Sequence, residues 1–429
     1  TVAALSDLSR LLRNVYRSAA MGAASGFSLF LFILHTLSRM KLLCSDLNET
    51  ELIDARDYYR EALSSYSAWS GWLHGHAFFV LCLVGVAANA LIVIVLLRPS
   101  MRSNPFNHFL VVIAFCDASL MFTYLIYRRI EVCHPYFFTY GFIVYTKYYA
   151  IFSVLLHAWS LWLTVNMAVL RWIVLSQGAS SSRTCPAANS SGAAFLSMAA
   201  ALLLAVLASL PNMLRYEITG GEQELPLPSI CAHSKWDSFW HESDMIRHYD
   251  LEQPRWWSCH LERISFWTAG VVGKLIPCGL LTLFMALLVR MLLEARKRRE
   301  RLCSSTSSGK TPAERTTVML TVIVAVFLVT ELPQGIAHLA VGMSPRLKYL
   351  SVHFNSLFDL LSLLNSAVNF VLCVSLSNVF RQECWQLLLA CVPRRMQQHD
   401  PLSQSTRMFT LPAGKDGFVP VPTGCPEEN

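Results

Sequence analysis

The sequence is poor in charged residues: Asp, Glu, Lys and Arg make up 15% of its 429 residues, against about 25% in soluble domains. Its 13 cysteines show no spacing typical of a zinc site, which argues against a metal centre. No nucleophile and base stand in a context typical of an enzyme. No repeat relates the two halves, which disfavours a secondary transporter. Together these features argue against a soluble enzyme, a metalloprotein and a secondary transporter.

Hydrophobic residues are abundant instead, at 54% of the chain, and they gather in blocks of about 20 residues or more, enough to cross a bilayer. Such long blocks satisfy their backbone in lipid as helices. The sequence therefore predicts an all-α membrane protein, a seven-transmembrane helix bundle. The predicted spans are His74–Leu97, Pro105–Tyr127, Phe142–Val174, Ala193–Met213, Ile264–Leu293, Thr316–Val341 and Leu350–Leu376.

These spans divide the chain into four parts. Residues 1–73 are predicted to form an extracellular segment, 74–376 the bundle, 377–391 a short amphipathic helix eight and 392–429 a disordered cytoplasmic tail. An apolar run within 21–39 is too short to span and resembles a signal-peptide core. The sequence does not decide whether that run is cleaved.

The orientation follows from the loop charges. The segment Arg290–Arg315 carries eight basic residues, whereas Leu214–Arg263 holds nine carboxylates and five basic residues. The basic segment should be cytoplasmic, which places the amino terminus outside a multi-pass protein of the plasma membrane. Asn48 begins a glycosylation triplet on that outer side. The net charge of +7 is explained by topology, so no nucleic-acid partner is expected.

Cysteines in the predicted outer loops face an oxidising space. A disulfide from Cys133 to either Cys231 or Cys259 would fix the long second outer loop to the mouth of the bundle. The sequence alone does not choose between the two partners.

Polar residues deep in the predicted spans form a first candidate site, because such groups are costly in lipid. One interpretation is a cluster that holds Na⁺ or water, since oxygen ligands suit hard cations. The other is a hydrogen-bonded packing contact between helices. The residues concerned are Asn89, Asp117, Ser160, Asn365, Ser366 and Asn369.

Ionisable residues toward the outer half of spans five to seven form a second candidate site. Lys274, Glu331, His338 and Asp359, together with Gln334, are tolerable there if they line a water-filled cavity. A purely structural ion pair between Lys274 and Glu331 is the alternative.

Three further residues invite a mechanical interpretation. Pro277 and Pro333 interrupt spans five and six, and each is either a hinge or a fixed kink. Arg171 stands at the inner end of span three, where an arginine commonly extends its charge to the membrane surface.

These motifs resemble the rhodopsin-like G-protein-coupled receptors. The matching stretches are Ala87–Leu91, Ala114–Asp117, Phe327–Pro333, Asn365–Phe370 and Ser377–Arg381. Within that class the chain is similar to the invertebrate myosuppressin, FMRFamide and sex-peptide neuropeptide receptors. That narrower similarity rests on Ser160–Val165, Lys274–Cys278 and Thr330–Gly335.

The resemblance implies a short amidated peptide as ligand and a heterotrimeric G protein, and arrestin, as inner partners. The implied ligand-binding residues are Tyr127, His157, Trp256, Trp257, Lys274, Glu331, Gln334, His338 and Asp359. The implied G-protein-coupling residues are Arg171, Arg296, Lys297, Arg298 and Arg299. The acidic second outer loop would attract the cationic residue of the peptide.

Departures from the family pattern leave a divergent orphan receptor with impaired signalling as an alternative. Cys373 replaces a tyrosine, which puts the inner-face rearrangement in doubt. Leu170 also replaces the usual acid before Arg171, but the resembled branch often lacks that acid. Thr146 stands near the usual cysteine of the third helix, which favours Cys133 as the loop anchor. A retinal pigment is excluded, because no lysine occurs in Leu350–Leu376.

Overall fold

A computed structural model describes residues 49–179, 191–229, 231, 236–241, 244–302, 312–344, 346–376 and 378–391. The predicted glycosylation site at Asn48, the run 21–39 and the tail 392–429 lie outside these residues. The side chains of Arg296 and Arg299 are also outside what is described.

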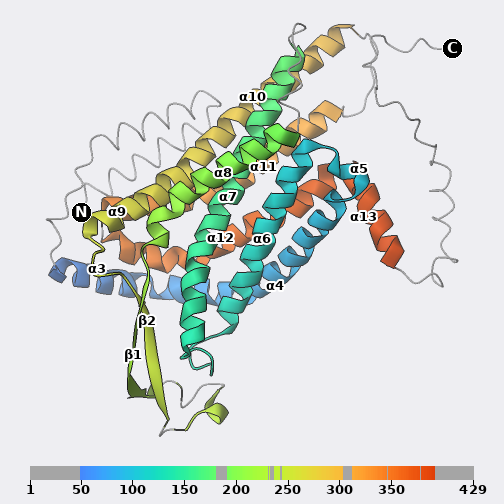
Figure 1. Cartoon of the computed structure of the whole chain (residues 1–429). Coiled ribbons are helices and arrows are strands. Elements are labelled where there is room, and N and C mark those ends of the chain that lie inside the picture. The colour runs from blue at the N-terminus through green and yellow to red at the C-terminus, as the bar shows by residue number, and fades with distance from the viewer. Residues whose placement is uncertain are drawn as a thin grey trace.

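Seven helices are long and apolar enough to cross a membrane, which confirms the predicted seven-transmembrane bundle. The fifth span consists of three consecutive helical segments, and the other six are single helices (Figure 1). The spanning elements are α4 (Ser64–Leu96), α6 (Pro105–Arg129), α7 (Tyr140–Ala179), α8 (Ser191–Met213), α9 (Cys259–Trp267) with η4 (Thr268–Leu275) and α10 (Ile276–Leu302), α11 (Pro312–Met343) and α12 (Leu347–Leu376).

Smaller elements distinguish the two ends of the bundle (Figure 1). The strands β1 (Glu217–Pro226) and β2 (Met245–Glu252), with the short turn η3 (Asp237–Phe239), project at one end, which we call the hairpin end. The helices α5 (Pro99–Arg102) and α13 (Asn378–Cys391) lie at the opposite end, which we call the α13 end. A further helix, α3 (Glu49–Ala62), precedes α4, so part of the predicted outer segment is helical.

Local sequence signals start several of these helices. The side-chain oxygen of Asn104 accepts a hydrogen bond from the Phe106 amide at 3.0 Å, and Pro105 occupies the first position of α6. Ser258 caps α9 in the same way. Both residues satisfy an amide that has no partner within the helix.

The fifth span departs from the single α-helix predicted over Ile264–Leu293. Its middle part, η4, is π-helical and ends just before Pro277. Proline has no amide hydrogen to donate to the preceding turn, and an additional residue in a turn is the usual form of a π-bulge. Gly270 and Gly335 bring η4 close to α11, because a Cβ on Gly270 would lie 3.0 Å from the Gly335 carbonyl oxygen.

The outer surface of the bundle is apolar. Leu196, Val329 and Phe115 are 75%, 64% and 60% exposed, respectively. Large apolar side chains without cover on spanning helices are expected to face lipid. The structure therefore describes a multi-pass membrane protein, with lipid as the surrounding partner.

A disulfide anchors the hairpin to the bundle. Cys133, in the connection after α6, is bonded to Cys231, between β1 and β2, with their Cα atoms 5.3 Å apart. Cys259 also belongs to a disulfide, so it is not free to bond Cys133. The choice that the sequence left open is thus decided in favour of Cys231.

The α13 helix is held to the loop after α4 by one acidic side chain. Glu383 accepts hydrogen bonds from Arg98 and from the Ser100 hydroxyl, both at 2.7 Å. Phe380 and Cys384 are buried beside the same loop. These contacts fix the direction in which the chain leaves α12.

Candidate functional site

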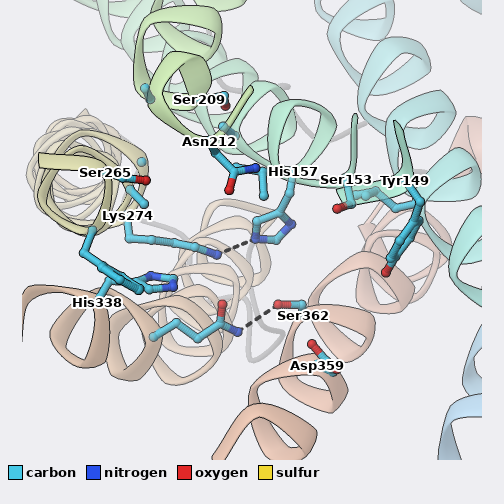
Figure 2. Close-up of a pocket in the computed structure, with 18 of the residues that line it drawn as sticks. Tyr149, Ser153, His157, Ser209, Asn212, Ser265, Lys274, His338, Asp359 and Ser362 are labelled. Atoms are coloured by element: carbon cyan, nitrogen blue, oxygen red, sulfur yellow. Dashed lines mark hydrogen bonds between the residues drawn. The ribbon is translucent and has the colours of Figure 1, made fainter. Parts of the chain in front are cut away.

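A cavity of about 260 Å³ lies inside the bundle, between α6, α7, α8, α9, η4, α11 and α12 (Figure 2). It reaches from Arg215, two residues before β1 begins, to Ser366 in α12. Its polar lining residues are Tyr124, Tyr149, Ser153, His157, Ser209, Asn212, Arg215, Ser265, Lys274, Gln334, His338, Asp359, Ser362 and Ser366. So many polar groups within membrane-spanning helices are tolerable only if the cavity holds water or a ligand.

Five of the nine residues predicted to contact a ligand line this cavity. These five residues come from four different elements. Figure 2 labels four of the residues: Lys274 and His338 lie on one side of the cavity, Asp359 lies on another side, and His157 lies between them. The five are His157, Lys274, Gln334, His338 and Asp359.

The other four predicted residues do not line the cavity. Glu331 is fully buried next to it, and Tyr127 lies behind Tyr149, with the two rings stacked at 4.7 Å. Trp256 is 58% exposed, and the Trp257 indole donates to Glu262 at 3.0 Å. The sequence could not give the depth or the direction of these side chains.

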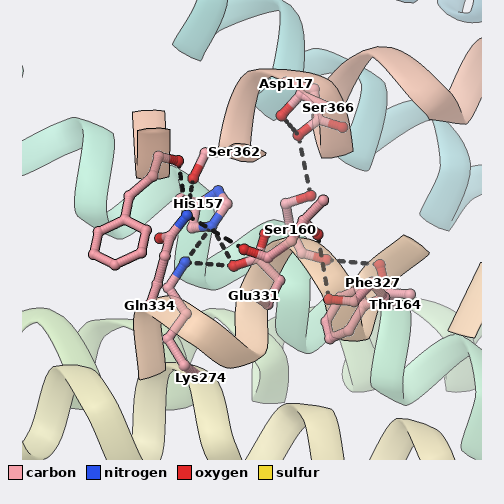
Figure 3. A network of polar contacts seen from close by, with 12 residues as sticks. Asp117, His157, Ser160, Thr164, Lys274, Phe327, Glu331, Gln334, Ser362 and Ser366 are labelled. Atoms are coloured by element: carbon pink, nitrogen blue, oxygen red, sulfur yellow. Dashed lines mark hydrogen bonds and ion pairs between the residues drawn. The ribbon is translucent and has the colours of Figure 1, made fainter. Parts of the chain in front are cut away.

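A buried group of three side chains lies beside the cavity (Figure 3). The Lys274 ammonium donates to Oε2 of Glu331 at 2.5 Å and to Nε2 of His157 at 2.6 Å. Nε2 of His157 also lies 3.0 Å from the same carboxylate oxygen. Because a nitrogen that accepts from the ammonium carries no proton, the imidazole hydrogen belongs on Nδ1. The predicted Lys274–Glu331 ion pair is therefore present, and Lys274 also faces the cavity.

Several buried polar atoms around this group have no hydrogen-bond partner among the described residues. They are Oε1 of Glu331, Nδ1 of His338 and Oγ of Ser209. His338 and Ser209 line the cavity. A buried donor or acceptor without a partner is costly, so these atoms suit a cavity that receives a polar ligand.

Gln334 connects two helices across the cavity. Its side-chain nitrogen donates to the Phe358 carbonyl oxygen and to the Ser362 hydroxyl, both at 2.8 Å. The residue follows Pro333, which lies inside the continuous helix α11. A ligand that contacts Gln334 would therefore act on the hydrogen bonds that join α11 to α12 next to Pro333.

A second polar group surrounds Asp359. The Tyr124 hydroxyl donates to Oδ2 of Asp359 at 3.1 Å, and Nε2 of His74 lies 2.5 Å from that hydroxyl oxygen. Sequence reasoning missed Tyr124, Tyr149 and His74. The spacing of four between Tyr145 and Tyr149 places both on one helix face, and it was the signal that could have suggested an aromatic wall.

Asp117 is the centre of the buried polar cluster at mid-bundle (Figure 3). Its carboxylate accepts from the hydroxyls of Ser160 and Ser366 at 3.2 Å each and from the Asn369 amide at 2.7 Å. Asn89 joins the cluster by donating to the Ser366 carbonyl oxygen at 3.0 Å. The described contacts of Asp117 do not include Asn365. Because Ser366 also lines the cavity, the cavity and this cluster meet at one residue.

Arg171 lies at the α13 end and is paired with an aromatic ring. Its guanidinium stands over Phe106, 5.5 Å from the ring centre. Lys297 and Arg298 are exposed at the same end of α10. The sequence showed that no acid precedes Arg171, but it gave no signal for Phe106 as the alternative partner.

Glu262 of α9 organises the entrance at the hairpin end. Its carboxylate accepts from Arg215 at 2.6 Å and from Trp257, and Gln253 donates to it at 2.9 Å. Burial raises the pKa of the neighbouring Tyr216 phenol, against the opposing effect of Arg215. Tyr216 therefore stays neutral, and the charged groups at this entrance include Arg215, Glu262 and Lys348, whose ammonium lies 3.4 Å from the Glu262 carboxylate.

Seven spanning helices around a polar cavity, with a disulfide-anchored hairpin at one end, define a seven-helix membrane receptor. The family profile described as serpentine type 7TM GPCR chemoreceptor Srw matches residues 76–391. The chain belongs to this family of G-protein-coupled receptors. The predicted resemblance to such receptors is thereby confirmed, and so is the prediction that the chain is not an enzyme.

Three similar proteins have curated names. The G-protein coupled receptor dmsr-1 of Caenorhabditis elegans is 30% identical over 371 residues, which cover 77% of this chain and 70% of that protein. Sex peptide receptor-related protein 2 of Caenorhabditis elegans is 25% identical, over 66% of this chain and 62% of its own length. The sex peptide receptor of Drosophila melanogaster is 26% identical, over 61% of this chain and 58% of its own length. The chain therefore lies near the invertebrate neuropeptide receptors.

Proposed function

We propose that this chain is a cell-surface receptor for a short amidated peptide and that it transmits binding at the hairpin end to a heterotrimeric G protein at the α13 end. The observation that carries the proposal is the polar cavity, which extends from Arg215 to Ser366 and so joins the hairpin end to the Asp117 cluster. The names of the relatives, which include a sex peptide receptor and a sex peptide receptor-related protein, support a peptide as ligand.

The orientation is part of this proposal. The Cys133–Cys231 disulfide lies at the hairpin end, and disulfides persist in oxidising, extracellular surroundings. The exposed basic residues Lys297 and Arg298 lie at the opposite end, and excess positive charge favours the cytoplasmic side. Both observations support an outer hairpin and an inner Arg171.

Binding must favour one arrangement of the bundle over another in order to signal. Gln334 and Ser362 join α11 to α12 inside the cavity, and Pro333 lies next to this contact. A peptide that displaces the Gln334 contact would free α11 to pivot at Pro333. That movement would uncover Arg171 at the inner face. Arrestin would use the same uncovered face.

The decisive test is a panel of amidated peptides, ending in Arg-Phe-amide or Trp-amide, applied to cells that express the full chain. We expect at least one peptide to activate a G protein, measured as separation of labelled G-protein subunits, with no uptake of labelled solutes. Arg171→Ala should abolish activation while surface expression persists. Peptide binding without activation would instead identify a receptor with impaired signalling, and solute uptake without activation would identify a transporter.

A bound Na⁺ at Asp117 is a further element of the proposal. One carboxylate and the hydroxyls of Ser160 and Ser366 converge at this point, and such oxygen ligands fit a hard cation. We expect replacement of Na⁺ by N-methylglucamine to raise peptide affinity a few-fold, as for a coupling free energy of about 1 kcal/mol. Asp117→Asn should remove this dependence. Equal affinity in both salts for the unmodified receptor would leave the cluster as a packing contact.

A further inference from the structure

The charged residues of the cavity are unequally paired. Lys274 is paired with Glu331 at 2.5 Å, and Arg215 is paired with Glu262 at 2.6 Å. Asp359 is the only carboxylate among the described residues that line the cavity. Its side chain is 50% exposed, and the nearest basic atom recorded for it is Nε2 of His74, at 4.0 Å. Arg128 also acts on this carboxylate through its charge, but no lysine or arginine among the described residues forms an ion pair with it, so the cavity presents one carboxylate without a close cationic partner.

Aromatic rings form a wall beside this carboxylate. Tyr124 and Tyr149 line the cavity, and Tyr124 donates its hydroxyl to Asp359. The ring of Tyr149 stacks on Tyr127 at 4.7 Å with an interplanar angle of 14°, and Tyr145 lies parallel at 6.3 Å. Stacking holds Tyr149 in one orientation, so that its ring is already in place when a ligand arrives.

We propose that Asp359 and the Tyr149 wall form a subsite for a guanidinium group, the side chain of an arginine in the ligand; this inference rests on the proposed peptide-receptor function. A ligand that fills the cavity removes water from Asp359, and a desolvated carboxylate is costly unless a cation pairs with it. A guanidinium offers a planar fork to the carboxylate and a flat face to an aromatic ring. Its attraction to the ring adds to the ion pair.

The opposite side of the cavity strengthens this assignment. Lys274 and His338 lie across the cavity from Tyr149 (Figure 2). A cationic ligand group is repelled by the ammonium of Lys274 and attracted by Asp359, so the charge distribution fixes one orientation of the ligand. The acidic hairpin then has a different role from Asp359: its exposed carboxylates attract the peptide at a distance, whereas Asp359 holds the arginine.

The structure suggests a test with matched peptides on the full receptor. The probes are amidated peptides ending in Arg-Phe-amide and their counterparts with citrulline in place of arginine. Citrulline keeps the shape of the side chain and removes its charge. The unmodified receptor should prefer arginine by about tenfold to a hundredfold in potency, the range expected for a charge-assisted hydrogen bond in a covered site. Asp359→Asn should reduce the preference to less than about threefold, because the amide removes the charged partner.

Two variants serve as controls. Glu222→Gln removes one exposed negative charge from β1 and should leave the preference for arginine intact, which separates contact from long-range attraction. Asp359→Glu keeps the charge and should retain a preference for arginine even if Asp359→Asn is poorly expressed. Surface expression is measured for every variant.

The outcomes separate this inference from the proposed function. Equal potency of arginine and citrulline peptides on the unmodified receptor would overturn the subsite while the peptide receptor stands. An equal loss of both peptides in Asp359→Asn would assign Asp359 a structural role and would also overturn the subsite. Absence of any response to the whole panel would overturn the proposed function, and the subsite with it.

Discussion

Replacing Lys274 with Met, or Glu331 with Gln, is expected to remove most of the receptor from the cell surface, whereas the double replacement should restore it. The two side chains are 9% and 0% exposed, and their charged atoms lie 2.5 Å apart. Removing one partner leaves a buried charge unpaired, which costs about 3–5 kcal/mol. That cost is a large fraction of the stability of a typical domain. Surface labelling of single and double variants measures the effect.

The double variant also decides between the two interpretations of this pair. Normal expression with normal peptide potency would make the pair purely structural. Normal expression with lost potency would show that the charged pair takes part in ligand recognition. Equal loss of expression in all three variants would contradict the pairing itself. Ser153→Ala, a substitution on the cavity wall outside the pair, is a suitable control for nonspecific effects.

Replacing Phe106 with Leu is expected to raise signalling in the absence of peptide. The guanidinium of Arg171 lies 5.5 Å from the centre of the Phe106 ring, and no acid precedes Arg171 to hold it. A cation–π contact is worth about 0.5 to 2 kcal/mol, so its loss should shift the resting equilibrium by about twofold to thirtyfold. Basal G-protein activation, divided by surface expression, measures this shift.

The matched control for Phe106 lies on the same helix. Phe115 is 60% exposed on α6, so Phe115→Leu should leave basal signalling unchanged. Phe106→Trp keeps an aromatic face and should preserve the low basal level. A fall in basal signalling in Phe106→Leu would mean that the ring supports the active arrangement of Arg171.

The bundle could be predicted from the sequence because membrane spans depend mainly on one local property, the length of an apolar block. The predicted end of span two at Tyr127 lies close to the end of α6 at Arg129. The helix that contains span one begins earlier than the predicted span, at Ser64 rather than His74. Polar residues such as Ser64 and Ser67 precede the apolar block there, and their helical state depends on contacts such as that between Ser67 and His353.

The candidate site could be predicted only in part. Lys274, His338 and Asp359, which line the cavity, were singled out because ionisable groups are rare in apolar spans, whereas His157 was named only through the family resemblance. Tyr124 and Tyr149 were missed because a tyrosine in a spanning helix is common and carries no such cost. The choice of Cys231 over Cys259 depends on the path of a long loop, which spacing along the chain does not determine.

The π-helical segment η4 has a consequence for any helical wheel drawn through the fifth span. Each residue of an α-helix turns by about 100°, and a π turn contains one residue more than an α turn. The segments Cys259–Trp267 and Ile276–Leu302, on either side of η4, are thus out of phase by about that angle. A single wheel assigns one of them to the wrong face. In an uninterrupted α-helix the step from Ser265 to Lys274 would turn by about 900° and put the two residues on opposite faces, so they share the cavity because of this offset.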